Sequence, residues 1–204
     1  MANFYISDLH IGHANIIRFD DRPFYALSDM HETIMNNWNA AVRGDDTVYI
    51  LGDFCWGNED LWLQSIGAFA GKKVLIRGNH DPKQFSPLLR KQFRDVQDYM
   101  ELTDGGRHVI LSHYAMPLYK GDFNPDCYML YGHVHRTHEY DILCSLRKSI
   151  RASCVGPDYP VGNFINVGCM LPWMNYTPRT LDEIIAGCGI ADEPLPYQPQ
   201  KSGE

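Results

Sequence analysis

Short apolar stretches in this chain repeatedly end on polar residues that can bind a metal ion. Five such stretches are present: residues 3–7 lead to Asp8 and His10, 47–51 to Asp53, 73–77 to Asn79 and His80, 109–112 to His113, and 128–131 to His133 and His135. Their length and their β-branched and aromatic residues predict β-strands. If these strands are parallel neighbours in one sheet, their carboxyl ends lie along one edge, where open α/β sheets bind ligands.

The polar residues at this edge suit two metal ions better than one. Asp8 and His10 are separated by one residue, so on an extended chain their side chains point the same way and can bind one ion. His133 and His135 have the same spacing. Either pair alone would be weak evidence, because alternating sequences produce such pairs by chance. Together with the three other strand ends they predict a binuclear metallohydrolase.

Three residues between these pairs have distinct predicted roles. Asp53 could bridge two cations, because one carboxylate has lone pairs for both, although a turn or helix-capping role is the common use of Asp at such a place. Asn79 offers a neutral carbonyl oxygen as a ligand, and an ordinary turn is its alternative. His80 follows directly and would point elsewhere, which suits proton transfer better than coordination.

The net charge and the cysteine content of the chain limit which binding partners and which cell compartment are expected. The net charge of −7 and pI of about 5.7 argue against gripping long nucleic acid, which needs a basic surface. They leave a small phosphorylated substrate possible, since bound cations would reverse the local charge. The six cysteines include no Cys-x-x-Cys pair. With no targeting segment and no membrane-length apolar run, these features predict a cytoplasmic protein with reduced thiols.

The order of elements predicts an α/β domain over residues 1–190. Helices are expected at residues 28–42, with Ser28 as N-cap, at 59–70, stopped by Gly71, and from a capping box formed by Thr180 and Glu183. Residues 136–163 have no clear periodicity and are expected to form a long loop beside the site. Residues 191–204, which contain prolines and few apolar residues, are expected to be a tail.

Five motifs follow one another along the chain: Asp8-x-His10, Gly52-Asp53, Gly78-Asn79-His80-Asp81, His113 and Gly132-His133-x-His135. In this order they resemble the motifs of the calcineurin-like metallophosphoesterase superfamily. The resemblance spans residues 3 to about 135. The strand at 164–167 resembles the closing strand of that fold, and the surrounding sequence resembles small bacterial and phage members.

The resemblance implies a four-layer α-β-β-α sandwich of two mixed sheets. It also implies two sets of metal ligands that share Asp53. His80 would be the catalytic histidine, oriented by a neighbouring carboxylate such as Asp81. The implied first set is Asp8, His10, Asp53 and His135, and the second is Asp53, Asn79, His113 and His133.

One departure from the family pattern concerns the phosphate-binding arginine. Protein Ser/Thr phosphatases of the superfamily follow Gly-Asp with Asp-Arg-Gly, whereas here Phe54, Cys55, Trp56 and Gly57 follow Asp53. Protein phosphatase activity is therefore not expected. Candidates for substrate binding are His13, Arg18 and Arg22, with Arg147, Lys148 and Arg151 as alternatives in the expected loop. A solvated surface charge is the commoner role for each of these arginines and for the lysine.

The predicted reaction is hydrolysis of phosphomonoesters or phosphodiesters by a hydroxide held between two divalent ions, with His80 as general acid and Asp53 as the bridge. The mixed donors favour Mn²⁺, with Fe, Zn²⁺ or Ni²⁺ possible. Alternatives are a cyclic-nucleotide phosphodiesterase or nuclease of the same superfamily, and a non-catalytic metal-binding scaffold. The sequence leaves the natural substrate, the choice between mono- and diester, and the oligomeric state open.

Overall fold

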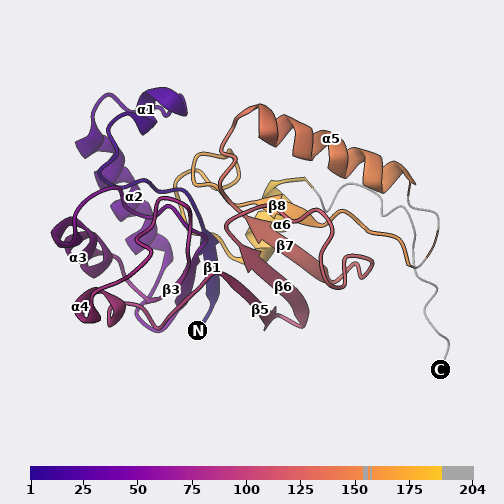
Figure 1. Cartoon of the computed structure of the whole chain (residues 1–204), viewed down its shortest axis with the longest axis horizontal. Helices are drawn as coiled ribbons and strands as arrows, with labels where there is room; N and C mark the ends of the chain where they lie inside the picture. Colours follow the sequence, from indigo (N-terminus) through magenta and orange to yellow (C-terminus); the bar gives the residue numbers. More distant parts are fainter. Residues whose placement is uncertain (154–155, 157, 190–204) are drawn as a thin grey trace.

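The computed structural model describes residues 1–153, 156 and 158–189, and the expected tail at 191–204 lies outside these residues. Two four-stranded sheets form its centre (Figure 1). In the first sheet β1 (Asn3–Ile6), β2 (Thr47–Ile50), β3 (Lys72–Ile76) and β4 (Asp95–Gln97) run parallel in that order. The four strands of this sheet are all parallel, so the implied mixed character is wrong for it, and it holds only the first three of the five ligand-bearing strands.

The second sheet contains the other two ligand-bearing strands. Its order is β5 (Tyr99–Asp104), β6 (Arg107–Ser112), β7 (Cys127–Tyr131) and β8 (Phe164–Asn166). The pair β5–β6 is antiparallel and the remaining pairs are parallel, so this sheet is mixed. The two sheets meet where β1 ends, because the backbone N–H of Ser7 donates to the carbonyl of Val167 at 3.0 Å.

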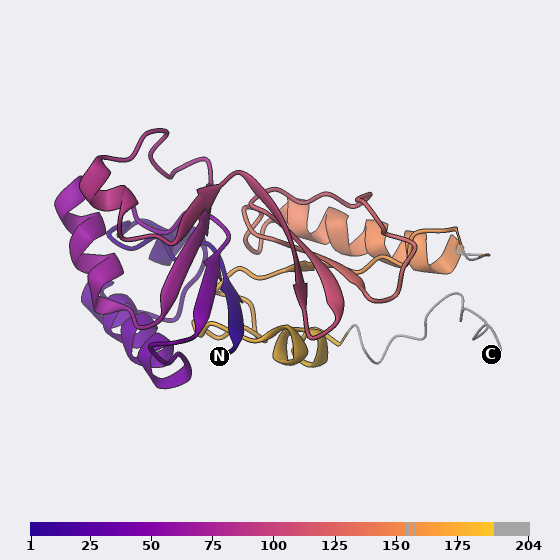
Figure 2. The ribbon, with the colours of Figure 1, turned by 90° about the horizontal axis from the view of Figure 1, so that it is seen from below.

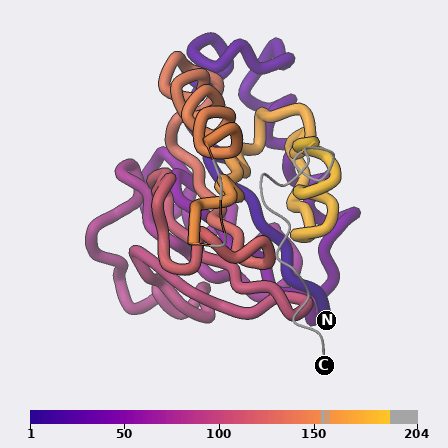
Figure 3. The backbone as a smooth tube through the Cα atoms, turned by 90° about the vertical axis from the view of Figure 1, so that its right-hand side faces the viewer, coloured from indigo at the N-terminus to yellow at the C-terminus, as the bar shows by residue number. Residues whose placement is uncertain are grey.

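Helices cover the outer faces of the two sheets, which confirms the four-layer α/β sandwich. Figure 2 shows the helices of the first half on one side of the first sheet, with the second sheet on its other side and α5 (orange) beyond that. Figure 3 shows that α6 (yellow) lies apart from α5, and α6 packs against β1. The helices are α1 (Ile16–Phe19), α2 (Leu27–Ala41), α3 (Glu59–Ala68), α4 (Pro87–Arg90), α5 (His138–Ser153) and α6 (Leu181–Gly187).

The strands of the second sheet alternate between two separate hydrophobic clusters. Leu111, Leu130 and Ile165 face the large core that the two sheets share. Ile110 and Met129, one residue away on their strands, face a smaller cluster that also contacts Leu143 and Ile150 of α5. This period of two places a buried face on each side of the sheet.

Helix α5 occupies most of the segment expected to be a loop. Its apolar residues Leu143 and Ile150 are only partly buried against the smaller cluster, while Ile142 and Leu146 are exposed. Arg151, a candidate for phosphate binding, is buried in this helix and donates to the carbonyl of Val161 at 2.8 Å. The sequence pattern did not predict this helix because cationic side chains interrupt the spacing of its apolar residues.

The other helix boundaries are close to their expected positions. Helix α2 begins at Leu27 with Ala26 as its N-cap, so the expected N-cap role of Ser28 is wrong. The side chain of Asp29 accepts from the backbone N–H of Ala26 at 3.2 Å. Helix α3 ends at Ala68, before Gly71, which has a φ of +83°. The capping box of α6, between Thr180 and Glu183, is confirmed.

Candidate metal centre

The loops that follow the strands place most of the donor residues in the left-handed backbone region. Such φ values are uncommon for residues other than glycine, and they cluster at functional sites where the surrounding structure holds them. The backbone therefore aims these side chains away from the directions that a regular strand would give them. The residues concerned are Asp8 (57°), His10 (51°), Asp53 (51°), His133 (71°) and His135 (49°).

Glycines let neighbouring ligand loops approach one another closely. A Cβ on Gly52 would overlap the His113 ring and lie 2.7 Å from the Cα of Gly78. A Cβ on Gly132 would lie 2.6 Å from Oδ2 of Asp8. Real Cβ atoms do not come so near to other heavy atoms, so these contacts between loops require glycine.

The first set of donors forms a tight group at the junction of the two sheets. One donor atom from each residue lies within 4.8 Å of the others, and all but His135 are fully buried. Nε2 of His10 is 3.6 Å from Oδ2 of Asp53 and 3.3 Å from Nε2 of His135. The members of this group are Asp8, His10, Asp53 and His135.

A second set converges on the other side of Asp53. Oδ1 of Asn79 lies 2.9 Å from Nε2 of His113 and 2.9 Å from Nδ1 of His133. The same Nε2 of His113 is 3.6 Å from Oδ2 of Asp53. Oδ2 of Asp53 thus faces an imidazole nitrogen of each set.

The chemistry of these donors fits a cation between them. Nδ1 of His113 donates to the carbonyl of Leu51 at 2.8 Å, which directs Nε2 of the same ring toward the amide oxygen of Asn79. Burial and the neighbouring His135 lower the pKa of His10 to about 2, so this imidazole is uncharged. Burial, together with the Asp8 carboxylate, raises the pKa of Asp53. Lone pairs and a buried carboxylate that face one another repel, and a divalent cation would offset that repulsion.

His80 stands at the edge of both sets rather than within either. Its Nε2 is 3.9 Å from Oδ2 of Asp53, and its side chain is 41% exposed. Its backbone N–H donates to Oδ1 of Asp53 at 3.0 Å, which fixes the loop while the ring faces the solvent. The imidazole is therefore open to a molecule that approaches the donors.

Asp20 is a member of the site that the sequence did not indicate. Its Oδ2 accepts from Nδ1 of His135 at 3.1 Å, which leaves Nε2 of that ring free to bind a metal. Burial acts to raise the pKa of Asp20, but the hydrogen bonds and charges of His135 and Arg22 together outweigh burial, and the net pKa is lowered. A carboxylate behind a metal-binding histidine fixes the tautomer and the ring orientation. No sequence spacing connects these two residues.

Two expectations for charged residues are wrong. Arg22 is neither on the surface nor open to substrate, because its buried guanidinium donates to Asp20 and to the carbonyls of Leu9 and Asp8. Asp81 does not orient His80. Its carboxylate accepts instead from backbone N–H groups, those of Asp53, Phe54 and Gly78.

Comparisons with known proteins place this arrangement in a family. Residues 24–180 match the model of the "Calcineurin-like phosphoesterase superfamily domain". The chain belongs to the calcineurin-like phosphoesterase superfamily. This membership confirms the resemblance seen in the motifs and supports metal binding and phosphoester chemistry at the level of the superfamily.

Two relatives and one solved structure are similar to this calcineurin-like chain over most of their length. It is 32% identical to the uncharacterized protein MJ1445 of Methanocaldococcus jannaschii over 89% of this chain and 88% of the relative. It is 33% identical to the Gene 66 protein of Mycobacterium phage D29, over 66% of this chain and 79% of the relative. A crystal structure of a protein of unknown function from Aquifex aeolicus, AQ665, matches with a TM-score of 0.64 and 27% identity, covering 90% and 97% of the two chains.

A hollow of about 520 Å³ opens beside the first donor set of this phosphoesterase domain. His13, a candidate for substrate binding, lines it, as do His10, Asp20, His80 and His135. Arg18 is exposed on α1, and its Cζ lies 5.3 Å over the ring of Phe19, which also lines the hollow. The structure thus brings His13 to the site and leaves Arg18 at its border.

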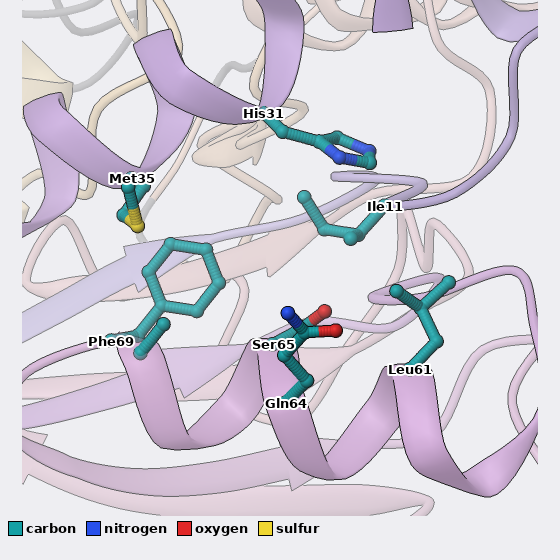
Figure 4. A pocket seen from close by; sticks show the side chains of 8 residues that line it. Ile11, His31, Met35, Leu61, Gln64, Ser65 and Phe69 are labelled. Atoms are coloured by element: carbon teal, nitrogen blue, oxygen red, sulfur yellow. The ribbon is translucent and has the colours of Figure 1, made fainter. Parts of the chain in front are cut away.

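A smaller cavity of about 180 Å³ lies behind the Asp8–His13 loop and does not reach the donors. Figure 4 shows Ile11, from that loop, and His31, from α2, above Leu61 and Phe69 of the α3 segment. Nε2 of His31 accepts from the backbone N–H of Gly12 at 2.8 Å. His31 therefore holds the loop from behind.

No helix among the described residues is long and apolar enough to cross a membrane.

Proposed function

We propose that this protein is a binuclear metal-dependent phosphoester hydrolase. The observation that carries the proposal is the position of Asp53, whose Oδ2 lies 3.6 Å from a nitrogen of His10 on one side and of His113 on the other. A single carboxylate between two groups of donors is what two neighbouring cations require to offset their repulsion.

The ligands of each ion follow from the two sets. Asp8, His10 and His135 would hold the first ion and Asn79, His113 and His133 the second, with Asp53 shared. Divalent cations bound there supply Lewis acidity at the phosphoryl oxygens and a water of lowered pKa. Carboxylate, amide and imidazole donors favour Mn²⁺, with Fe, Zn²⁺ and Ni²⁺ as further candidates.

His80 would act as the proton donor. It borders both donor sets without belonging to either, and its side chain is open to the solvent. Nε2 of His80 would hold a proton and transfer it to the oxygen of the departing alcohol, a contribution of roughly 10²–10⁴-fold. Asp53, which accepts from the backbone N–H of His80, would keep that ring next to the reacting group.

A small phosphorylated molecule is the proposed substrate, since the net charge of −7 disfavours long nucleic acid. Parallel assays with mono- and bis-p-nitrophenyl phosphate would separate a phosphatase from a cyclic-nucleotide phosphodiesterase or nuclease. A scaffold without catalysis is less consistent with a chain that keeps His80 and all seven ligand residues.

The deciding experiment measures metal content and phosphoesterase activity in parallel. The protein incubated with Mn²⁺ should bind two ions per chain and hydrolyse at least one of the two nitrophenyl esters. Asp53→Ala should lower bound metal and rate together, whereas His80→Ala should keep the metal and lose most of the turnover. His108→Ala, at a partly exposed histidine that pairs with Glu101, is the matched control and should change neither. Retention of both ions in Asp53→Ala, or full activity in His80→Ala, would contradict the assigned roles.

A further inference from the structure

The hollow beside the first donor set has an aromatic wall, which we define as Phe19, His13 and Trp56. The rings of His13 and Trp56 stack with centroids 4.5 Å apart and planes at 16°. Phe19 meets His13 edge-on at 6.2 Å. The wall leads directly to the catalytic histidine, since the ring centroids of Trp56 and His80 are 4.8 Å apart.

The wall exposes apolar surface that the fold does not use. Phe19 is 65% exposed and Trp56 is 45% exposed, although the core holds other aromatic side chains at almost no exposure. Large aromatic rings that line a hollow next to reactive groups are typical of ligand sites. These two side chains therefore have surface available for a ligand.

The backbone behind the wall is held in place. The N–H of Trp56 donates to the carbonyl of Ile11 at 2.7 Å, which ties it to the loop that carries His10. Phe19 lies in α1, where its N–H donates to the carbonyl of Asn15 at 3.0 Å. A ligand that stacks here would meet rings carried on backbone that is hydrogen-bonded next to the donors, and such preorganisation favours binding.

The charges around the hollow indicate an uncharged ligand group. None of the described residues that line it is a lysine or arginine, and its one carboxylate, Asp20, already accepts from His135 and Arg22. A second hollow of about 350 Å³, beside Asn79, is more polar and is lined by Arg77, Lys83 and Asp98. The two hollows thus differ in charge. A third hollow, of about 420 Å³ beside His80, is also lined by Trp56 and, in the described part of the chain, likewise by no lysine or arginine.

We infer that the substrate is a phosphate ester whose leaving alcohol carries a flat, uncharged aromatic ring, such as a nucleobase, and that Trp56 and Phe19 bind this ring. The inference rests on the proposed function, because the phosphate must lie at the donor sets for the ring to reach the wall. Water attacks phosphorus, the bond from phosphorus to the alcohol oxygen breaks, and His80 returns a proton to that oxygen. The products are phosphate, or a monoester if the substrate is a diester, and the free alcohol.

The test compares substrates that differ only in the ring. Values of kcat/KM are measured for adenosine 5′-monophosphate and ribose 5-phosphate with the Mn²⁺-loaded full chain, and for the 5′-methyl diesters of both. Stacking of one base on aromatic side chains predicts a preference for the adenosine compound on the order of 5- to 100-fold. Equal kcat/KM values for the two substrates would overturn the inference.

Variants assign the preference to the wall. Trp56→Ala and Phe19→Ala should each lower the ratio of the two kcat/KM values by at least about threefold, whereas Trp56→Phe should keep most of it. Leu88→Ala, at a 57% exposed position of α4, is the matched control and should leave the ratio unchanged. Because Phe19 is mostly exposed, its variant should fold even if Trp56→Ala does not. A ratio that neither alanine variant changes would also overturn the inference.

A binding measurement separates this inference from the proposed function. Saturation-transfer NMR of adenosine and of ribose with the full chain should show transfer to the adenine protons, reduced in both alanine variants, and none to ribose. If the chain hydrolyses no phosphate ester but still binds adenosine in this way, the proposed function is wrong and the aromatic wall stands as a binding surface. If it hydrolyses esters without any adenosine signal, the proposed function stands and the aromatic substrate is wrong.

Discussion

Oδ2 of Asp81 accepts a hydrogen bond from the backbone N–H of Asp53 at 3.0 Å. The same oxygen accepts from Gly78 at 2.8 Å, and Oδ1 accepts from Phe54 at 3.0 Å. One buried side chain therefore joins the loops after β2 and β3, which carry the proposed bridging ligand Asp53 and the proposed proton donor His80. The carboxylate suits this place because both of its oxygens accept and neither donates.

Replacing Asp81 with Asn should weaken the fold and the metal site together. The amide NH₂ would face at least one backbone N–H group, so a buried donor loses its acceptor at a cost of about 1–3 kcal/mol. Chemical denaturation and metal analysis would measure both effects. Asp98→Asn, at an exposed carboxylate paired with Arg77, should cost no more than about 1 kcal/mol. Equal losses in the two variants would contradict the role of Asp81.

Gly52→Ala should destabilise the protein more than a comparable change elsewhere. Gly52 has a φ of +86°, and an added Cβ would press on His113 and Gly78. Gly106 has a φ of +84° with nothing within 4 Å of an added Cβ, so Gly106→Ala isolates the cost of the backbone conformation, about 1–2 kcal/mol. Crowding should add about 1–3 kcal/mol in Gly52→Ala. Thermal unfolding of both variants would measure the two losses of stability. Equal losses would mean that the ligand loops can move apart to accept the added Cβ.

Arg22→Met should be strongly destabilising, because Arg22 is a buried structural cation rather than a substrate ligand. Methionine keeps much of the volume but removes the cation paired with the Asp20 carboxylate and the donor to the carbonyls of Asp8 and Leu9. Removing one partner of a buried ion pair costs about 3–5 kcal/mol. Arg18→Met, at an exposed position nearby, should change the free energy of unfolding by less than about 0.5 kcal/mol.

Asp20→Asn should weaken metal binding without removing a metal ligand. The neutral amide is a poorer acceptor for Nδ1–H of His135, so that ring becomes less basic and less firmly oriented. Changes at such partners lower metal affinity by about 10–100-fold. Calorimetric titration with Mn²⁺ would measure the effect, with Asp21→Asn at the exposed neighbouring position as control. Unchanged affinity in Asp20→Asn would contradict the orienting role.

The protein should lose stability in mild acid because His31 becomes protonated there more readily in the unfolded chain than in the folded one. Burial lowers the pKa of His31 below the value of about 6.5 expected in the unfolded chain, so the unfolded state binds the proton more readily. The contribution of neutral His31 is complete above pH 6.5 and is lost as the pH falls from there toward the lower folded pKa. Free energies of unfolding at pH 7.5 and 5.5 should therefore differ more in the wild type than in His31→Gln, which can still accept from Gly12.

The sequence revealed the site more fully than the fold. Every proposed metal ligand follows an apolar stretch, and this local pattern survives in the structure at β1, β2, β3, β6 and β7. The division into two sheets was predicted only by the family resemblance. An apolar stretch predicts a buried strand but does not show which of two sheets the strand joins. Partnerships over long separations, such as Asp20 with His135, leave no local trace. The burial of Arg22 was hidden for a further reason, which is that arginines usually remain at the surface.

The ligands of the proposed centre come from both halves of the molecule. Asp8, His10, Asp53 and Asn79 follow strands of the first sheet, whereas His113, His133 and His135 follow strands of the second. A bound cation would accordingly tether one half to the other, and its binding free energy would add to the cooperativity of the whole chain. Heat tolerance would then depend on metal supply, and a chelator would lower the melting temperature even where no substrate is ever encountered.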